Sequence, residues 1–336
     1  MTKTILLAHG SGGEMSHELI RDLFVSAFDN AKLSEQGDSA ILDDLPAGRV
    51  ALTTDSYVVK PLIFPGGNIG ELAVCGTVND LAVMGARPLY LTAGFILEEG
   101  LDYGMLRNIV ASMAATARAA GVQIVAGDTK VVDRGAADGM FINTAGVGVI
   151  PPGLDLGPHR IQPDDVILVN GTIGDHGMAV MMQREGLAFE SALESDTAPL
   201  NGLIDDLLEA LPDKVHWMRD ATRGGLATVL NEWSESAEVG IHLTEADIPV
   251  REEVRAACEF LGLDPLYVAN EGKVVIAVAA ECADRALEIL RRHDLGHNAV
   301  MIGHVTDAHR HVVLETPYGA RRIVQMLTGA QLPRIC

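Results

Sequence analysis

The organisation of the chain is decided by residues 141–153, which read Phe-Ile-Asn-Thr-Ala-Gly-Val-Gly-Val-Ile-Pro-Pro-Gly. Residues 141–150 are mostly apolar or β-branched, which is typical of a strand. The Pro-Pro-Gly run at 151–153 can continue neither a strand nor a helix, so it marks a break between two units. A chain of 336 residues is also long for a single hydrophobic core. The sequence therefore predicts one domain over residues 1–150 and a second over residues 151–327, followed by a tail.

Both halves mix predicted strands with predicted helices. In the first half, the patterns predict strands at 49–59, 89–96, 122–126 and 141–150, and helices at 68–85 and 105–120. In the second half, strands are expected at 166–170, 273–279 and near residues 299 and 311, and helices after Gly177, after Gly225 and over 282–292. This mixture predicts two α+β domains.

The composition excludes several classes of function. The chain carries 46 acidic and 25 basic residues, a net charge of −21, which disfavours binding to nucleic acid or to an anionic membrane. No apolar stretch is long enough to span a membrane, and the apolar run at 5–8 is too short for a signal peptide. The four cysteines contain no Cys-x-x-Cys pair, so neither a zinc site nor a disulfide framework is indicated. We expect a cytoplasmic protein with reduced thiols.

The chain ends at Pro333-Arg334-Ile335-Cys336, and we interpret the terminal thiol as functional. Residues 328–336 could span roughly 30 Å when extended, so we predict a flexible tail that carries the thiol between sites. Pro333 forbids a helix that runs to the end of the chain. The alternative is an ordinary frayed terminus.

Four aspartates, Asp38, Asp55, Asp80 and Asp128, stand in predicted turns, at element ends, or beside Gly or Asn. Singly, each could be a helix cap or an Asx-turn. Together they would repel strongly, because two charges about 4 Å apart cost about 4 kcal/mol at an effective dielectric constant of about 20. A divalent cation would relieve this repulsion, and Mg²⁺ favours carboxylates combined with substrate phosphates. The set therefore predicts a magnesium–nucleotide site.

Other motifs add candidates for binding and for proton transfer. No Walker A or G-x-G-x-x-G motif is present, so unusual loops must hold any nucleotide. Gly224-Gly225 at a predicted helix start could offer backbone N–H groups to phosphate, with Arg223 beside them, or could be a plain helix entry. Lys130, at a predicted strand end, and Glu271, in a turn between Asn270 and Gly272, could move protons, although each alone would be an ordinary surface charge.

Taken together, the motifs resemble one family over essentially the whole chain. They are His9-Gly-Ser-Gly-Gly13, Thr53-Thr-Asp-Ser56, Asn79-Asp80, Gly127-Asp-Thr-Lys130, Arg219-Asp-Ala-Thr-Arg-Gly-Gly225, Asn270-Glu-Gly-Lys273 and the terminal Pro-Arg-Ile-Cys. The chain resembles the HypE family, the carbamoyl dehydratases of nickel–iron hydrogenase maturation. More distantly, it is similar to the aminoimidazole ribonucleotide synthetase superfamily. This resemblance implies N-terminal domains that pair as a dimeric β-barrel and a C-terminal α/β sandwich.

The resemblance also implies an activity and its partners. A carbamoyltransferase, HypF, would load a carbamoyl group onto Cys336. The enzyme, a homodimer, would use ATP to dehydrate the S-carboxamide to an S-cyanate. The cyano group would then pass to iron on a HypC–HypD scaffold.

Residue roles follow from the matching motifs. Cys336 would carry the group, and Lys130 and Glu271 would dehydrate it. The magnesium ligands would be Asp38, Asp55, Asp80 and Asp128. Nucleotide contacts are expected from the same aspartates and from Asn79, Thr129, Asp220, Thr222, Arg223 and Gly224.

Three rival functions explain less of the sequence. A selenophosphate synthetase would place a reactive cysteine in the N-terminal glycine loop, but no cysteine precedes Cys75. A thiamine-monophosphate kinase gives no reason for a terminal cysteine. A metal-handling maturation chaperone would need clustered ligands, and the 11 histidines show no such spacing.

Overall fold

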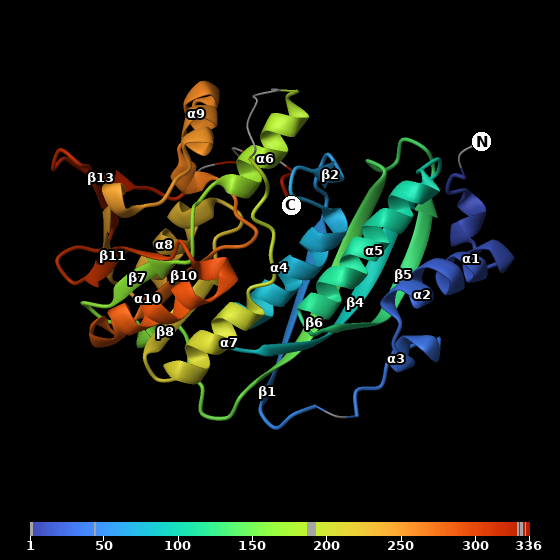
Figure 1. The fold of residues 1–336 in the computed structure, drawn as a ribbon, viewed down its shortest axis with the longest axis horizontal. Helices are drawn as coiled ribbons and strands as arrows, with labels where there is room; N and C mark the ends of the chain where they lie inside the picture. Colours follow the sequence, from blue (N-terminus) through green and yellow to red (C-terminus); the bar gives the residue numbers. More distant parts are fainter. Residues whose placement is uncertain (1–2, 44, 187–192, 328, 330–331, 333) are drawn as a thin grey trace.

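The fold is that of a computed structural model, which describes residues 3–43, 45–186, 193–327, 329, 332 and 334–336. Thr328 and Pro333 of the predicted tail lie outside the described residues. Figure 1 shows two units side by side, each a sheet with helices packed on it. No described helix is both long enough and apolar enough to cross a membrane.

The N-terminal domain is built on a four-stranded sheet with the order β1-β6-β4-β5. Its strands are β1 (Arg49–Tyr57), β4 (Arg87–Glu98), β5 (Gln123–Val132) and β6 (Met140–Ile150). Only the β4–β5 pair is parallel. Helices α4 (Ile69–Val83) and α5 (Tyr103–Ala119) lie together across one face, as Figure 1 shows. Asn68 caps α4 by accepting hydrogen bonds from the backbone of Gly70 and Glu71, which confirms the predicted start of this helix.

The other face of this sheet is left uncovered by the residues that the structure describes. Val50 and Leu52 of β1 and Ile96 of β4 project from it, and Leu52 is 74% exposed. β1 and β5 are open edges, so the described part of one chain contains an open sheet and not a closed barrel. The barrel implied by the resemblance would need a second copy.

Short elements complete the N-terminal domain. The helices before β1 are η1 (Leu7–Gly10), α1 (Glu14–Leu19), the π-helical η2 (Ile20–Val25), α2 (Ser26–Phe28) and α3 (Ala31–Ser34). They lie beside β5 and α5 in Figure 1. Between β1 and α4, β2 (Ile63–Phe64) and β3 (Gly67–Asn68) form a small hairpin.

The C-terminal domain is built on a seven-stranded sheet with the order β13-β12-β9-β11-β7-β10-β8. The strands are β7 (Val166–Val169), β8 (Val215–Asp220), β9 (Gly240–Thr244), β10 (Val274–Val278), β11 (Val300–Thr306), β12 (Val312–Glu315) and β13 (Arg321–Val324). The larger helices are α6 (Asp175–Arg184), α7 (Asn201–Ala210), α8 (Gly225–Ser236), α9 (Glu252–Leu261) and α10 (Ala283–Arg292). Short η3 (Pro158–Arg160), η4 (Glu245–Asp247), η5 (Pro265–Tyr267), η6 (Ala280–Cys282) and η7 (Asp294–Gly296) connect them.

Helices cover both faces of this second sheet. Alternate residues of β10 point to opposite sides, as expected for a strand. Val275 packs in one core with Trp233 of α8, whereas Ile276 packs in another with Leu207 of α7 and Leu290 of α10. This layering is the α/β sandwich expected for the C-terminal domain.

One boundary prediction was wrong in a way that affects the site. The segment Gly127–Lys130 was expected to follow a strand that ended at residue 126, but it lies inside β5. β5 is an edge strand with one exposed face, so polar side chains there do not end the pairing with β4. Asp128 and Lys130 are therefore strand residues and not turn residues.

Candidate active site

The two domains meet at a segment that follows the undescribed residues 187–192. Ser195 donates its backbone N–H to Pro65 of the N-terminal domain at 2.8 Å. Asn79 of α4 donates its side-chain amide to Ala198 at 3.0 Å and accepts from the Leu200 N–H at 2.7 Å. Asn79, expected among the nucleotide contacts, thus binds backbone at the domain junction.

A pair of aspartates lies at this junction on the N-terminal side. In β1, Thr53 and Asp55 share the face that is covered by α4, because alternate strand residues point the same way. The Thr53 hydroxyl donates to Asp80 of α4 at 2.8 Å. Burial raises the pKa of Asp80, and the negative charge of Asp55 adds to that rise. The structure therefore brings Asp55 and Asp80 together.

Two further carboxyl groups come from the C-terminal domain. Asp220, at the end of β8, has its pKa raised to about 7 by burial first and by the charge of Asp80 second. Glu271 is only 3% exposed. Burial is the main reason that its pKa is raised well above the ordinary value. The negative charge of Asp220 makes the next largest contribution to this rise. Four carboxyl groups, of which Asp220 and Glu271 are buried and Asp55 and Asp80 partly buried, thus act on one another electrostatically.

The loop that carries Glu271 is fixed from several directions. Asp196 accepts hydrogen bonds from the backbone N–H groups of Glu271 at 3.2 Å and Gly272 at 3.1 Å, and pairs with Lys273 at 2.8 Å. Burial alone would raise the pKa of Asp196, but Lys273 and these donors outweigh it and lower the pKa. A Cβ atom at Gly272 would lie 1.9 Å from the Asp196 carbonyl oxygen, so only glycine fits there. Glu271 is consequently held in a defined place.

The loop before α8 faces the same junction. Gly224 and Gly225 both have positive φ, 72° and 59°, and a Cβ at Gly225 would lie 2.6 Å from the Val268 carbonyl oxygen. α8 begins here without a side-chain cap, which leaves backbone N–H groups for another acceptor. Arg223 lies 3.7 Å from Asp55, and Thr222 precedes it. This arrangement supports the predicted phosphate-binding role of the loop.

The end of the chain reaches this cluster. Ile335 is buried in the N-terminal core, and Cys336 packs against that core. The terminal oxygen of Cys336 accepts the Val58 N–H at 3.1 Å. Burial, then the charge of Glu271, raises the pKa of the Cys336 thiol to about 12. In its docked position the thiol is therefore protonated and lies within the electrostatic reach of Glu271.

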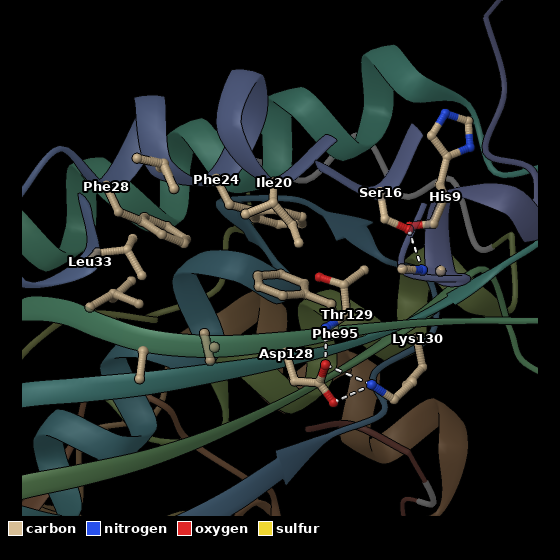
Figure 2. Close-up of a pocket in the computed structure, with 17 residues that line it drawn as sticks. His9, Ser16, Ile20, Phe24, Phe28, Leu33, Phe95, Asp128, Thr129 and Lys130 are labelled. Carbon is tan, nitrogen blue, oxygen red and sulfur yellow. Dashed lines mark hydrogen bonds and ion pairs between the residues drawn. The ribbon is translucent and has the colours of Figure 1, made fainter. Parts of the chain in front are cut away.

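Four predicted site residues, Asp38, Asp128, Thr129 and Lys130, lie elsewhere in the single chain. Figure 2 shows Asp128 and Lys130 on the side of β5 opposite to Thr129 and Phe95, which face the N-terminal helices. Lys130 binds the Asp128 carboxylate at 2.6 and 2.7 Å, and no described contact joins it to Glu271 or Cys336. Asp38 lies exposed in the segment before β1. The four predicted magnesium ligands therefore do not converge within one chain.

The described residues contain no group of three or more His, Cys, Asp or Glu side chains placed to hold a metal ion. Of the four predicted magnesium ligands, Asp55 and Asp80 are the two that lie at the junction. Two carboxylates suffice for Mg²⁺ when substrate phosphates and water complete its shell. The residues thus fit a magnesium ion that arrives with a nucleotide.

A second feature is an apolar cavity of about 220 Å³ beneath the N-terminal helices. Figure 2 shows Ile20, Phe24 and Phe28 from these helices facing Phe95 across it. His9, Ser16 and Thr129 supply polar groups on its wall, and Asp128 and Lys130 line it too. The cavity was not predicted, since it forms between segments more than 60 residues apart.

Sequence reasoning also missed the residues that hold the tail and the Glu271 loop. His176, Arg184 and Asp196 carry these contacts. No motif separates them from other polar residues of the chain, because their partners lie between 75 and 159 positions away.

Comparisons with known proteins place this geometry in a family. Residues 36–150 match the family model for the N-terminal domain of AIR synthase related proteins, and residues 162–315 match that for the C-terminal domain. The chain is 54% identical to the carbamoyl dehydratase HypE of Azotobacter vinelandii over 334 residues, which cover 99% of this chain and 97% of that protein.

Two solved structures are also similar. A HypE in complex with ATP superposes with a TM-score of 0.95 at 50% identity, covering 99% of this chain and all of that one. The HypE of a HypE–HypF complex superposes with a TM-score of 0.81 at 51% identity, covering 92% of this chain and 99% of that one. Identity at this level over nearly the whole chain confirms the resemblance read from the motifs. The chain belongs to the HypE family of carbamoyl dehydratases.

Proposed function

We propose that this chain dehydrates a carbamoyl group carried on its own Cys336 to a thiocyanate, at the expense of ATP. The observation that carries the proposal is the docked Cys336 thiol, which packs against the N-terminal core within electrostatic reach of the buried Glu271 carboxyl group. A thiol that lies near a cluster of buried polar groups is placed to present a group bound to its own sulfur. The membership of the chain in a family of carbamoyl dehydratases supports the same reaction.

The chemistry requires a better leaving group than hydroxide. ATP would phosphorylate the amide oxygen of the S-carboxamide, and the C–O bond would then break as inorganic phosphate leaves. Loss of both amide protons gives the nitrile, so that S-carboxamide and ATP yield S-cyanate, ADP and phosphate. Glu271 is suited to accept an amide proton, because its raised pKa makes its ionised form a stronger base than an exposed carboxylate.

ATP is supported as the co-substrate by the similar HypE structure that contains it. We assign its phosphates to the junction, where Arg223 and backbone N–H groups at the uncapped start of α8 would meet them. A magnesium ion held by Asp55 and Asp80 would neutralise phosphate charge. The apolar cavity beside Thr129 has walls suited to a nucleotide base.

A second copy of the chain completes the proposal. Asp38, Asp128 and Lys130 do not reach the junction of their own chain, and Lys130 projects from the uncovered sheet face. A homodimer that covers this face would explain its exposed Leu52 and would let one copy supply these residues to the other.

We therefore expect the purified protein to be a dimer. Static light scattering at micromolar concentration is the measurement. Leu52→Glu should shift the mass toward that of one chain, because a buried charge opposes the interface. The matched control is Phe260→Glu, since Phe260 is 67% exposed in the C-terminal domain. A monomeric wild-type protein would contradict the shared site.

We also expect Mg²⁺-dependent ATP binding that weakens when Asp80 becomes Ala. Loss of a carboxylate that faces the metal and phosphates should lower affinity by about tenfold or more, since hydrogen bonds and contacts to charged groups contribute about 1.5–3 kcal/mol. Asp128→Ala should weaken binding similarly if a second copy completes the site. Isothermal titration calorimetry, with the exposed Asp294→Ala as a control, measures both. Unchanged affinity in both variants would remove the metal-site assignment.

The partners follow from the docked thiol. A protonated, half-buried thiol cannot receive a carbamoyl group from another enzyme, so we propose that the last residues leave this position for loading. A carbamoyltransferase of the HypF type is the expected donor, in line with the HypE–HypF complex among similar structures. A HypC–HypD scaffold is the expected acceptor of the cyano group.

The decisive experiment follows the C-terminal peptide by mass spectrometry. The wild-type protein, loaded by the carbamoyltransferase and given ATP, should produce a tail lighter than the loaded tail by one water. The step should require hydrolysable ATP. A loaded tail that stays unchanged with ATP and Mg²⁺ would overturn the proposed function.

A further inference from the structure

The docked tail is held by side chains from both domains. Arg184 of α6 donates to the carbonyl oxygens of Arg334, at 2.5 Å, and of Lys60, at 2.6 Å. The Arg334 guanidinium pairs with Asp138 and lies over the ring of Phe141. Arg334 therefore lies at the boundary between the two domains.

Arg334 has a positive φ of 58°, which is unfavourable for a residue with a Cβ atom. Such a conformation persists only when its surroundings hold it. The contacts of the tail must therefore offset a local cost. Each of these contacts therefore helps to determine the position of Cys336.

The hydrogen bond between His176 and Ile335 shows which ring nitrogen of His176 carries the proton. His176 of α6 is buried, and its Nε2 atom lies 3.0 Å from the Ile335 carbonyl oxygen. A carbonyl can only accept, so Nε2 must carry the proton. Nδ1 lies 2.8 Å from the Ser195 hydroxyl, which then donates to it. The Thr197 N–H donates to the same Ser195 oxygen at 3.1 Å.

This chain of hydrogen bonds links the tail to the Glu271 loop. Ser195 and Thr197 flank Asp196, whose carboxylate fixes the backbone of Glu271 and Gly272. The hydroxyl that orients the His176 imidazole and the carboxylate that orients the Glu271 loop thus lie on the same short segment, residues 195–197. Phe64 packs edge-on against the His176 ring at 5.4 Å and limits its rotation.

We propose that His176 is a positioning residue that sets the register of the terminal cysteine against Glu271. Its neutral imidazole donates to the carbonyl one residue before Cys336, and Ser195 fixes the tautomer that allows this. The described hydrogen bonds of the His176 ring go to Ile335 and Ser195, and none goes to the Cys336 sulfur. The role rests on the proposed function, since it matters for dehydration only if Cys336 carries the substrate.

The test compares two substitutions at one position. His176→Leu fills much of the space but cannot donate, whereas His176→Gln offers an N–H donor near the position of Nε2. His216→Gln is the matched control, because His216 is another buried histidine of the same domain, bonded to Asp165 at 2.7 Å. Thermal melting of each variant establishes that it is folded.

The first readout is alkylation of Cys336 by iodoacetamide at pH 8, followed on the C-terminal peptide. Loss of the hydrogen bond should raise the rate about tenfold in His176→Leu, because the undocked thiol reacts. His176→Gln should restore much of the protection, and His216→Gln should match the wild type. Ser195→Ala, which keeps the ring, should give a smaller rise and serves if His176→Leu does not fold.

The second readout is single-turnover dehydration of the carbamoyl-loaded tail. His176→Leu should slow it by about the same factor, with ATP affinity unchanged and with rescue by Gln. Wild-type rates of alkylation and dehydration in His176→Leu would overturn the positioning role, as would equal losses in His216→Gln. A wild-type tail that is loaded but never dehydrated would instead overturn the proposed function, while the alkylation comparison would still decide the role of His176.

Discussion

A Cys336→Ser protein should bind ATP and keep its fold, yet form no cyanated tail. The side chain is only partly buried and the hydroxyl nearly matches the thiol in size, so the packing of Ile335 beside it should survive. The reaction should fail because an oxygen in place of sulfur is a poorer acceptor of the carbamoyl group and a poorer donor of the cyano group. Mass spectrometry of the C-terminal peptide after incubation with the carbamoyltransferase and ATP measures the loss.

The other three cysteines provide matched controls. Cys75 and Cys258 are buried and Cys282 is partly buried, and none lies in the tail. Each changed to Ala should still allow cyanation, with at most about 3 kcal/mol of lost stability where the thiol is packed in a core. A Cys336→Ser protein that still supports cyanide-ligand formation would falsify the carrier-thiol hypothesis. The end of the chain would then be a docked structural segment only.

Part of the fold could be predicted from local patterns in the sequence. The break at residues 151–153 and the mixed elements of each half were enough to predict two α+β domains. Strong local signals explain this success, since Asn68 at a helix start and apolar runs such as 274–278 determine their own conformation. Local signals could not show on which face of β5 Lys130 lies. That face is defined only if the strand continues past residue 126, and local signals predicted that it ended there.

The docked position of Ile335 and Cys336 could not be predicted from local sequence patterns. The hydrogen bonds of residues 334–336 join residues 150 to 278 positions apart. No local pattern within the last residues of the chain predicts such distant partners. The convergence of Asp55, Asp80, Asp220 and Glu271 was only partly foreseen. Motif matching found all four, but Asp220 was expected as a nucleotide contact and not as part of one carboxyl cluster.

A Glu271→Gln protein should accept the carbamoyl group but dehydrate it about 10²–10⁴ times more slowly, the usual effect of removing a positioned acid or base. Gln keeps the size of the side chain, and the backbone contacts to Asp196 remain. Single-turnover analysis of the loaded tail measures the rate. Glu71→Gln is the matched control, because Glu71 is a half-buried carboxyl group on α4 whose pKa is also raised by burial.

The same substitution should make the protein more stable at pH 8. Because the pKa of Glu271 is raised in the folded state, the folded protein binds a proton that the unfolded chain releases above its ordinary pKa of about 4.3. The wild-type free energy of unfolding therefore falls as the pH rises above that value, and Gln removes this loss. Urea unfolding should show little difference between the two proteins at pH 4 and a clear advantage for Glu271→Gln at pH 8.

The two measurements together separate a base from a structural residue. A buried side chain kept for packing should leave the protein less stable when it is changed, whereas a carboxyl group kept for chemistry against an electrostatic cost should leave it more stable and less active. If Glu271→Gln gains stability but keeps a near-wild-type rate, the proton acceptor lies elsewhere, and Lys130→Ala tests the other candidate. If only Lys130→Ala lost dehydration, Lys130 would be the proton acceptor. Because Lys130 projects from the uncovered sheet face in a single chain, this result would require a second copy of the chain at the site.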